Sequence, residues 1–421
     1  MSEVFLLGAA TAAHQVEGNN IYSDCWALEQ MEGSMYKEPS LDAVDHYNRY
    51  EEDIQLMADA GLNAYRFSIE WARIEPEQGS YDEKEITHYQ NVLKYCLEHG
   101  ITPIVTMHHF SSPKWLIQKG GWENQDTIKY FTEYCQFVVQ KLGDLMEYVC
   151  TINEANMGLQ IAAIARDMML QMGIKPQVGI NFELPEEFQK IRNQEAAVFG
   201  LNQGDAVNTF LSLRTEQGDL LIMQAHESAR DAMKKICPHL KIGVTLSLYD
   251  LQVEPGGEKA AEQEWAEQFT HYLPYMQKDD FIGVQNYTRK IIGKNGSMPV
   301  PTGAETTQMG YEFYPEAISN VIREVWKSIQ LPIIVTENGV ATEDDSRRVV
   351  FIEKALKGLK ACIHEGIPVY GYLYWSLLDN FEWQEGFSKQ FGLIAVDRSD
   401  QRRIPKKSLE SLGTFNKQWK N

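Results

Sequence analysis

Eight short apolar runs alternate with helical periodicity along this chain. The runs lie at residues 4–10, 63–69, 101–107, 147–152, 241–248, 281–286, 332–336 and 368–375, and runs this short predict strands. Between most of them apolar residues recur at i, i+3 and i+4, which predicts helices over 45–60, 83–99, 125–142, 219–236, 315–328 and 347–364. Gly61, Gly100 and Gly366 each follow the last helical turn, as in a tight helix-to-strand connection. Eight such units predict an α/β chain folded as a single (β/α)8 TIM barrel.

The chain of 421 residues shows no Pro/Gly/Ser-rich linker or charge block, so we expect one catalytic domain over residues 1–421. No apolar run approaches the roughly 18 residues that span a bilayer. The run at 4–10 lacks a basic start and follows Glu3, so it predicts a first strand and not a signal peptide. The six cysteines form no CxxC motif and no Cys/His cluster, which predicts reduced thiols and, without a targeting segment, a cytoplasmic protein.

The charge balance restricts the partners. A formal net charge of −20 repels phosphate, so neither nucleic acid nor a membrane surface is expected as a partner. Neutral small molecules are more compatible with this charge than phosphate-bearing partners are. No metal or other cofactor is expected, and homo-oligomerisation is left open.

Two glutamates follow apolar runs in closely similar settings, Thr151-Ile152-Asn153-Glu154 and Thr336-Glu337-Asn338-Gly339. Glutamate is rarely buried unless it is paired or functional. Barrel enzymes place their chemistry at the C-terminal ends of the strands, so we expect the fold to bring Glu154 and Glu337 together. The plainer alternative is one helix N-cap and one salt bridge at the rim.

Other strand ends carry amide, imidazole, guanidinium and indole groups. Such a set suits a neutral polyol, because it offers hydrogen bonds to hydroxyls and flat platforms for C–H faces. Taken singly, His109 could be an ordinary core histidine and Trp375 ordinary packing. The residues at or just beyond the strand ends are Gln15, Arg66, His109, Asn153, Asn286, Tyr287, Trp375, Glu382 and Trp383.

The ordered motifs of the chain resemble those of the family-1 glycoside hydrolases, the β-glucosidase and β-galactosidase type, over essentially the whole length. They are Phe5-Leu6-Leu7-Gly8-Ala9-Ala10-Thr11-Ala12-Ala13-His14-Gln15-Val16-Glu17-Gly18, Arg66-Phe67-Ser68-Ile69-Glu70-Trp71-Ala72-Arg73-Ile74, Thr151 to Glu154, Asn286-Tyr287, Thr336 to Gly339, and Trp375-Ser376-Leu377-Leu378-Asp379-Asn380-Phe381-Glu382-Trp383.

The resemblance implies a retaining β-glycosidase that hydrolyses terminal, non-reducing β-D-glucosides by double displacement, with β-galactosides and β-fucosides as further substrates. It implies Glu337 as nucleophile, Glu154 as acid/base, and Arg66 and Tyr287 beside the nucleophile. By the same match the sugar is bound by Gln15, His109, Asn153, Asn286, Trp375, Glu382 and Trp383, with Asn153 on the 2-hydroxyl. The partner is a small β-glycoside or oligosaccharide.

Three departures from the family pattern stand out. Ala155 replaces the usual proline after Glu154, which predicts a looser catalytic loop. Phe110 replaces a tryptophan that is common after the histidine. The segment at about 156–218 is atypical, rich in Met157, Met168, Met169 and Met172, and these methionines fit core filling or an adaptable aglycone wall.

The sequence also raises three alternatives to the hydrolysis of unphosphorylated β-glucosides. A 6-phospho-β-glycosidase of the same family would hold its phosphate with a serine and a lysine near the last strand. Ser388 and Lys389 are close by, but Glu382 would repel the phosphate. A catalytically silent glycan-binding barrel would lose one of the two carboxylates, and both are present. Transglycosylation uses the same covalent intermediate and is not separable from hydrolysis by sequence.

Overall fold

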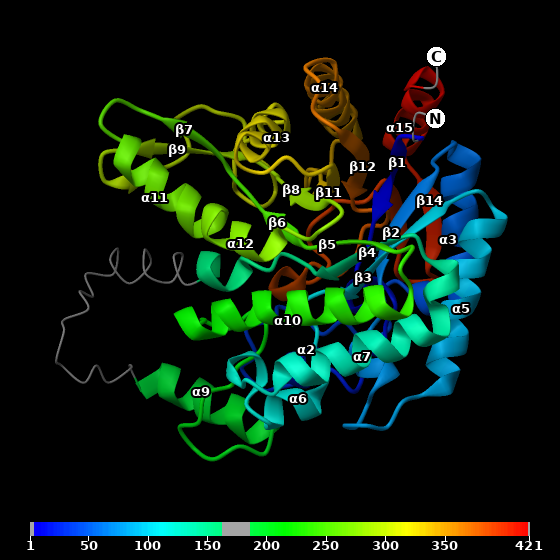
Figure 1. Cartoon of the computed structure of the whole chain (residues 1–421), viewed down its shortest axis with the longest axis vertical. Helices are drawn as coiled ribbons and strands as arrows, with labels where there is room; N and C mark the ends of the chain where they lie inside the picture. Colours follow the sequence, from blue (N-terminus) through cyan, green and yellow to red (C-terminus); the bar gives the residue numbers. More distant parts are fainter. Residues whose placement is uncertain (1–3, 162–185, 420–421) are drawn as a thin grey trace.

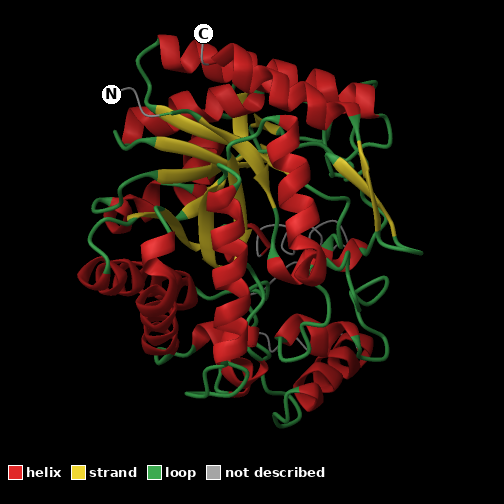
Figure 2. Ribbon diagram, turned by 90° about the vertical axis from the view of Figure 1, so that its right-hand side faces the viewer, coloured by secondary structure: helices red, strands yellow, loops and turns green. Residues whose placement is uncertain are grey.

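The computed structural model describes residues 4–161 and 186–419, and within them a parallel sheet curls into a barrel surrounded by helices (Figures 1 and 2). The strands follow in the order β5-β4-β3-β2-β1-β12-β11-β8-β6, and every pairing is parallel. Their bounds are β1 Leu6–Ala10, β2 Ala64–Ser68, β3 Thr102–His108, β4 Tyr148–Ile152, β5 Lys241–Gly243, β6 Thr245–Ser247, β8 Ile282–Gln285, β11 Ile333–Asn338 and β12 Val369–Trp375. The predicted TIM barrel is confirmed.

The fifth barrel strand is divided into two segments. β5 pairs with β4 and β6 pairs with β8, with only Val244 between the two segments. The sequence predicts one strand over 241–248. The change of partner at Val244 brings the two ends of the sheet together and sets Thr245 beside the residues that follow β4.

The six helices predicted from periodicity are present, with ends within a few residues of expectation. They are α3 His46–Ala60, α5 Glu83–Glu98, α7 Thr127–Leu142, α10 Glu216–Ile236, α13 Ala317–Ser328 and α14 Asp345–His364. The three glycines expected at helix ends have left-handed φ values of +92° at Gly61, +70° at Gly100 and +90° at Gly366, where a side chain would be strained.

Smaller elements complete the fold. The helices are α1 Ala13–Val16, α2 Asp24–Glu29, α4 Trp71–Ile74, α6 Lys114–Gln118, α9 Glu186–Val198, α11 Glu258–Gln268, α12 Leu273–Met276 and α15 Lys407–Trp419, with 3-10 turns η1 Gly121–Glu123, η2 Gly143–Leu145, η3 Thr270–Tyr272 and η4 Trp383–Glu385. Two outer sheets join β7 Asp250–Val253 to β9 Arg289–Gly293 and β10 Gly296–Ser297, and β13 Ile394–Asp397 to β14 Arg402–Pro405.

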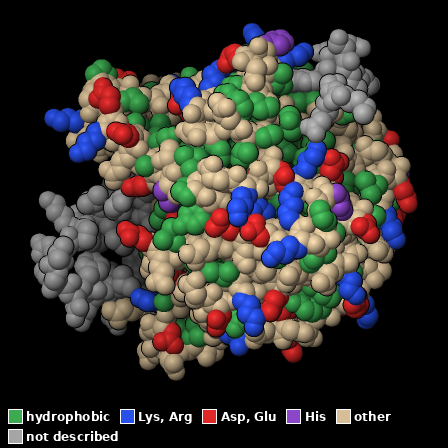
Figure 3. Space-filling view, in the orientation of Figure 1, with side chains coloured by type: hydrophobic (Ala, Val, Ile, Leu, Met, Phe, Trp, Pro, Cys, Tyr) green, Lys and Arg blue, Asp and Glu red, His purple; other side chains and the backbone are tan. Residues whose placement is uncertain are grey.

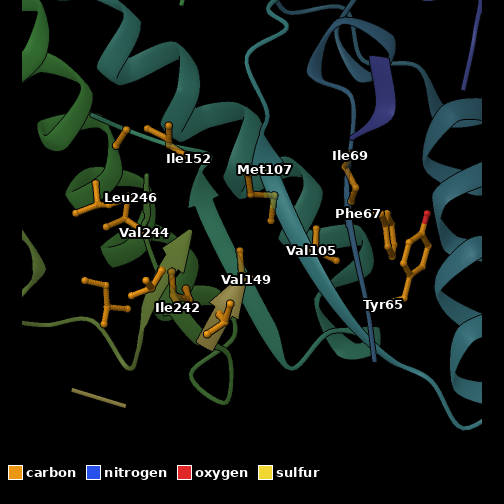
Figure 4. Close-up of a cluster of buried hydrophobic side chains, with 14 of the residues drawn as sticks. Tyr65, Phe67, Ile69, Val105, Met107, Val149, Ile152, Ile242, Val244 and Leu246 are labelled. Atoms are coloured by element: carbon orange, nitrogen blue, oxygen red, sulfur yellow. The ribbon is translucent and has the colours of Figure 1, made fainter. Parts of the chain in front are cut away.

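Alternate residues of each barrel strand face two different cores. On β2, Tyr65 and Phe67 belong to the large cluster between barrel and helices, which Figure 4 shows together with Val105 and Val149 of the neighbouring strands. Residues of opposite parity fill the barrel interior: Leu6, Ala10, Ala64, Ile104, Cys150, Ile334, Leu373 and Trp375. Because side chains alternate along a strand, Arg66 necessarily points inward, into the barrel.

The atypical segment at 156–218 falls partly on residues 162–185, so the expectations for Met168, Met169 and Met172 lie outside the described residues. No helix in the described ranges is long and apolar enough to cross a membrane. On the face seen in Figure 3, basic and acidic side chains are interspersed, and no broad basic patch is visible.

Candidate active site

The Arg66 guanidinium joins Glu337 to Asn153, the residue that precedes Glu154. Arg66 Nη1 donates to Glu337 Oε1 at 2.6 Å, and Arg66 Nη2 donates to Asn153 Oδ1, also at 2.6 Å. Asn153 directly precedes Glu154. Both carboxyl side chains are buried, with Glu154 5% and Glu337 3% exposed. The structure therefore brings together the two acidic motifs, which are 183 residues apart in the sequence.

Glu337 lies in β11 and is held at both carboxylate oxygens. Tyr287, just beyond β8, donates its hydroxyl to Oε2 at 2.6 Å, while Arg66 occupies Oε1. Burial raises the pKa of Glu337 above its ordinary value, and the charge of Arg66 and the two hydrogen bonds act in the opposite direction. Both predicted neighbours of Glu337 thus favour its ionised form.

Glu154 has fewer groups that favour its charge. Burial and the nearby Glu337 raise its pKa well above the ordinary value, opposed by the Ser247 hydroxyl and more distantly by Arg66. Glu337 is raised less and is directly paired with a cation. When two carboxyls share a site, the better stabilised one ionises first. This environment therefore favours the ionised form of Glu337 and the protonated form of Glu154.

The backbone of Glu154 is unusual, with a left-handed φ of +43°. Its N–H donates to Thr245 Oγ1 at 3.0 Å, and the N–H of Ala155 donates to the Thr245 carbonyl at 3.0 Å. Ala155 is fully buried. Proline at this position would lack the second donor, so the departure at residue 155 supplies a contact that fixes the loop.

Asn153 and His109 form a small network beside the two carboxyls. The Asn153 Oδ1 also accepts from Gln285 Nε2 at 2.7 Å, and its Nδ2 donates to His109 Nε2 at 3.1 Å. His109 Nε2 is thus an acceptor, which leaves the proton on Nδ1. Burial and the charge of Arg66 lower the pKa of His109 well below its usual range, so the ring is neutral. One amide hydrogen of Asn153 has no partner among the described residues, and His109 Nδ1 is buried without a hydrogen-bond partner there.

Glu382 and Gln15 lie together on the far side of the site. Gln15 Nε2 donates to Glu382 Oε2 at 3.3 Å and to the Phe381 carbonyl at 2.7 Å. Burial raises the pKa of Glu382 to about 8, and Glu337 adds to the shift. The Trp375 indole donates to Glu382 and opposes it. Such a carboxyl can accept from, and when protonated donate to, sugar hydroxyls.

Aromatic rings line the same region. His109 is nearly parallel to Trp375, with ring centroids 5.7 Å apart, and to Trp383 at 6.3 Å. Phe110, where the sequence departs from the family, contacts Trp383 at 5.2 Å in a tilted arrangement. These rings supply the flat surfaces expected of a sugar site.

The Asn286 side chain binds the backbone through its amide hydrogens, while its Oδ1 has no partner among the described residues. Its Nδ2 donates to the backbone carbonyls of Leu248 and Thr288, both at 2.8 Å. The backbone carbonyl of Asn286 accepts from Asn338 Nδ2. Because both amide hydrogens bind backbone, this side chain fixes the loop that carries Tyr287.

Three supporting residues were missed in the sequence: Thr245, Gln285 and Ser247. Each is a polar side chain within a strand that is otherwise buried. Polar residues of inward parity in apolar strands are the signal that could have found them. Metal chemistry has no evident ligand set here, because no cluster of His, Cys, Asp or Glu suited to a metal ion occurs within residues 4–161 and 186–419.

Comparison with known proteins gives a consistent result. The chain matches the family description glycosyl hydrolase family 1 over residues 1–190 and 258–420. It is 29% identical to β-glucosidase A of Thermotoga maritima, covering 96% of this chain and 95% of that protein. It is also 29% identical to 6-phospho-β-galactosidase 1 of Streptococcus pneumoniae, covering 96% and 95%. The crystal structure of β-glycosidase BGL167 superposes with a TM-score of 0.91 at 44% identity, covering 100% of this chain and 97% of that one.

Proposed function

We propose that this chain, which belongs to glycosyl hydrolase family 1, is a retaining β-glycosidase that removes terminal β-D-glucosyl units from small glycosides or oligosaccharides. The observation that carries the proposal is the Arg66 bridge, which pairs with Glu337 and binds the residue before Glu154. This arrangement favours opposite protonation states in two buried carboxyls, as acid-assisted displacement at an anomeric carbon requires.

In the first step, the ionised Glu337 attacks the anomeric carbon while Glu154 gives its proton to the departing glycosidic oxygen. The bond from Glu337 to the sugar neutralises the nucleophile. The repulsion that raised the pKa of Glu154 is thereby removed, so Glu154 leaves this step as a carboxylate that can accept a proton. In the second step it takes a proton from water, whose oxygen attacks the anomeric carbon and releases Glu337.

The glycone contacts follow from the free hydrogen-bonding groups of the site. We assign Gln15 and Glu382 to sugar hydroxyls, with Trp375 and Trp383 as platforms. Asn153 has one remaining amide hydrogen, which we assign to the 2-hydroxyl, and we assign His109 to the neighbouring hydroxyl. Contacts to the 2-hydroxyl strengthen in the oxocarbenium-like transition state.

A 6-phosphoglycoside is the second candidate, because one relative is a 6-phospho-β-galactosidase. The two groups that could hold a phosphate already have partners. Lys389 Nζ donates to the Gln308 carbonyl at 2.9 Å and pairs with Glu385 at 3.1 Å, and Ser388 Oγ donates to the Glu385 carbonyl. Because Lys389 and Ser388 are already engaged, this environment favours the unphosphorylated sugar.

We further propose a cytoplasmic location and a role in carbohydrate metabolism. All six cysteines are buried and unpaired, which suits a reducing compartment.

The test combines specificity with stereochemistry. Initial rates on p-nitrophenyl β-glucoside, β-galactoside, β-fucoside and 6-phospho-β-glucoside should rank an unphosphorylated sugar first. Proton NMR of the first-formed product should show the β-anomer, and an initial α-anomer would exclude the double displacement.

A further inference from the structure

A buried arginine, Arg214, donates a hydrogen bond to the loop that carries Glu154. Arg214 Nη1 donates to the carbonyl of Ala155 at 3.1 Å, and Nη2 donates to the Phe210 carbonyl at 2.6 Å. The residue is only 8% exposed, and no carboxylate among the described residues forms an ion pair with it. A buried guanidinium without an ion-pair partner is costly, so its position calls for an explanation.

The segment around Arg214 is itself firmly fixed. Trp122 N donates to the Asn208 carbonyl at 3.0 Å, and Thr215 binds Glu123 through both its N–H and its hydroxyl, at 2.8 and 2.6 Å. The Phe210 ring is fully buried, and the Arg214 Cζ lies 4.6 Å from its centroid. Arg214 is therefore a rigid donor and not a mobile surface side chain.

The carbonyl that Arg214 binds belongs to Ala155, the residue that directly follows the acid/base residue. Glu154 has the left-handed φ of +43°, a conformation that persists in a non-glycine residue only where the surroundings enforce it. Thr245 binds the two N–H groups of Glu154 and Ala155 from within the barrel. Arg214 binds the carbonyl of Ala155, which belongs to the next peptide unit, so Thr245 and Arg214 together hold the backbone on both sides of Ala155.

We propose that Arg214 is a positioning residue for Glu154: it does not touch the substrate, but it holds the backbone that aims the acid/base carboxyl at the glycosidic oxygen. The inference rests on the proposed function, because it assumes that Glu154 is the acid/base. It extends that function by giving a residue of the atypical segment a role in the reaction.

Gly158 provides an independent way to disturb the same contact. A Cβ added at this residue would come within 2.5 Å of the Arg214 Cζ and Nε. Its φ is not left-handed, and the residue sits in a helical turn, so alanine is compatible with its backbone. Gly158→Ala should therefore displace the guanidinium while Arg214 itself is retained.

The experiment compares kcat/KM for a dinitrophenyl β-glucoside, which needs no acid assistance, with that for an alkyl β-glucoside, which does. Arg214→Met and Gly158→Ala should each lower the alkyl rate by about 10- to 100-fold, as expected for a displaced catalytic group, and leave the dinitrophenyl rate within about threefold. The basic limb of the alkyl pH profile should move to lower pH, because a displaced Glu154 lies farther from Glu337. Arg214→Lys should recover part of the loss.

Arg348 supplies a control, since it is a fully buried arginine that donates to the carbonyls of Thr342 and Gln390; unlike Arg214, it also pairs with Asp345. Arg348→Met should change both rates by the same factor.

Equal losses on the two substrates in the folded Arg214→Met protein overturn the inference and leave Arg214 a purely structural role. If Arg214→Met does not fold, Gly158→Ala decides by the same criterion. If Glu154→Ala shows no leaving-group dependence, the proposed function itself fails.

Discussion

Arg66 and Glu337 form a fully buried ion pair that joins β2 to β11, although these strands are not neighbours in the barrel. The pair stabilises the carboxylate form of Glu337 against the cost of burial.

Arg66→Met should lower kcat/KM on all substrates by about 10²–10³, because the ionised nucleophile loses its cation. The pKa of Glu337 rises further without Arg66, so the acidic limb of the pH profile should move to higher pH. The measurement is the pH dependence of kcat/KM. Arg403 forms another buried pair, with Asp53 at 2.7 and 2.8 Å, and Arg403→Met should destabilise the fold without moving that limb.

Glu154→Ala should retain glycosylation by dinitrophenyl glycosides and lose about 10²–10⁴ on poor leaving groups, since only the latter need a proton. Added azide should restore turnover and give the β-glycosyl azide. Glu337→Ala should lose activity on both kinds of substrate. An α-glycosyl azide from Glu154→Ala would mean that the two roles are wrongly assigned.

Glu154→Gln should be more stable than the wild type at alkaline pH. The pKa of Glu154 is raised on folding, so the stability that its proton contributes is present at low pH and is lost as pH rises through the folded pKa. Glutamine stays neutral, and the gain in Tm should grow from pH 5 to pH 9. Glu365, whose pKa is lowered by Arg323, is the opposite case, and Glu365→Gln should show no such gain.

Glu382→Ser should weaken action on free glucosides and raise the ratio of kcat/KM for the 6-phosphoglucoside over the free glucoside. The change removes a buried carboxyl, which in its charged form above a pKa of about 8 repels phosphate, and it leaves Lys389 as a cation in the same loop. Loss of a buried hydroxyl partner costs about 1–3 kcal/mol, which corresponds to a fall of roughly 5- to 150-fold on the free sugar. A wild-type enzyme that already prefers the phosphorylated sugar contradicts the proposed substrate class.

Ala155→Pro should destabilise the chain by about 1–3 kcal/mol, because the Thr245 carbonyl loses its donor. Proline also restricts the preceding residue to extended backbone, whereas Glu154 has a φ of +43°. Urea unfolding measures the change. Ala155→Gly keeps the N–H and serves as the control; equal activity and stability of the proline variant and the wild type would contradict this account of the loop.

The barrel could be predicted because its signals are local. Short apolar runs such as 332–336 and glycines such as Gly61 indicate element type and order without knowledge of distant contacts. The two glutamates could be placed because parallel strands end at one face. The family pattern, more than the chemistry of single residues, pointed to Gln15 and Glu382.

Other features depend on contacts that no local pattern encodes. Asn286 was expected to bind the sugar, but its donors go to two backbone carbonyls. The break at Val244 follows from closing the sheet, and the contact of Arg214 with Ala155 joins residues 59 apart in the sequence. Such roles become visible only when distant segments pack together.

The Arg66 bridge also links function to assembly. A side chain from the second strand binds one partner next to the fourth strand and another in the seventh, so no fragment that ends before β11 can contain the complete proposed catalytic centre. Turnover regained during renaturation should therefore appear only once the ring of strands has shut, which makes catalysis a reporter of barrel closure.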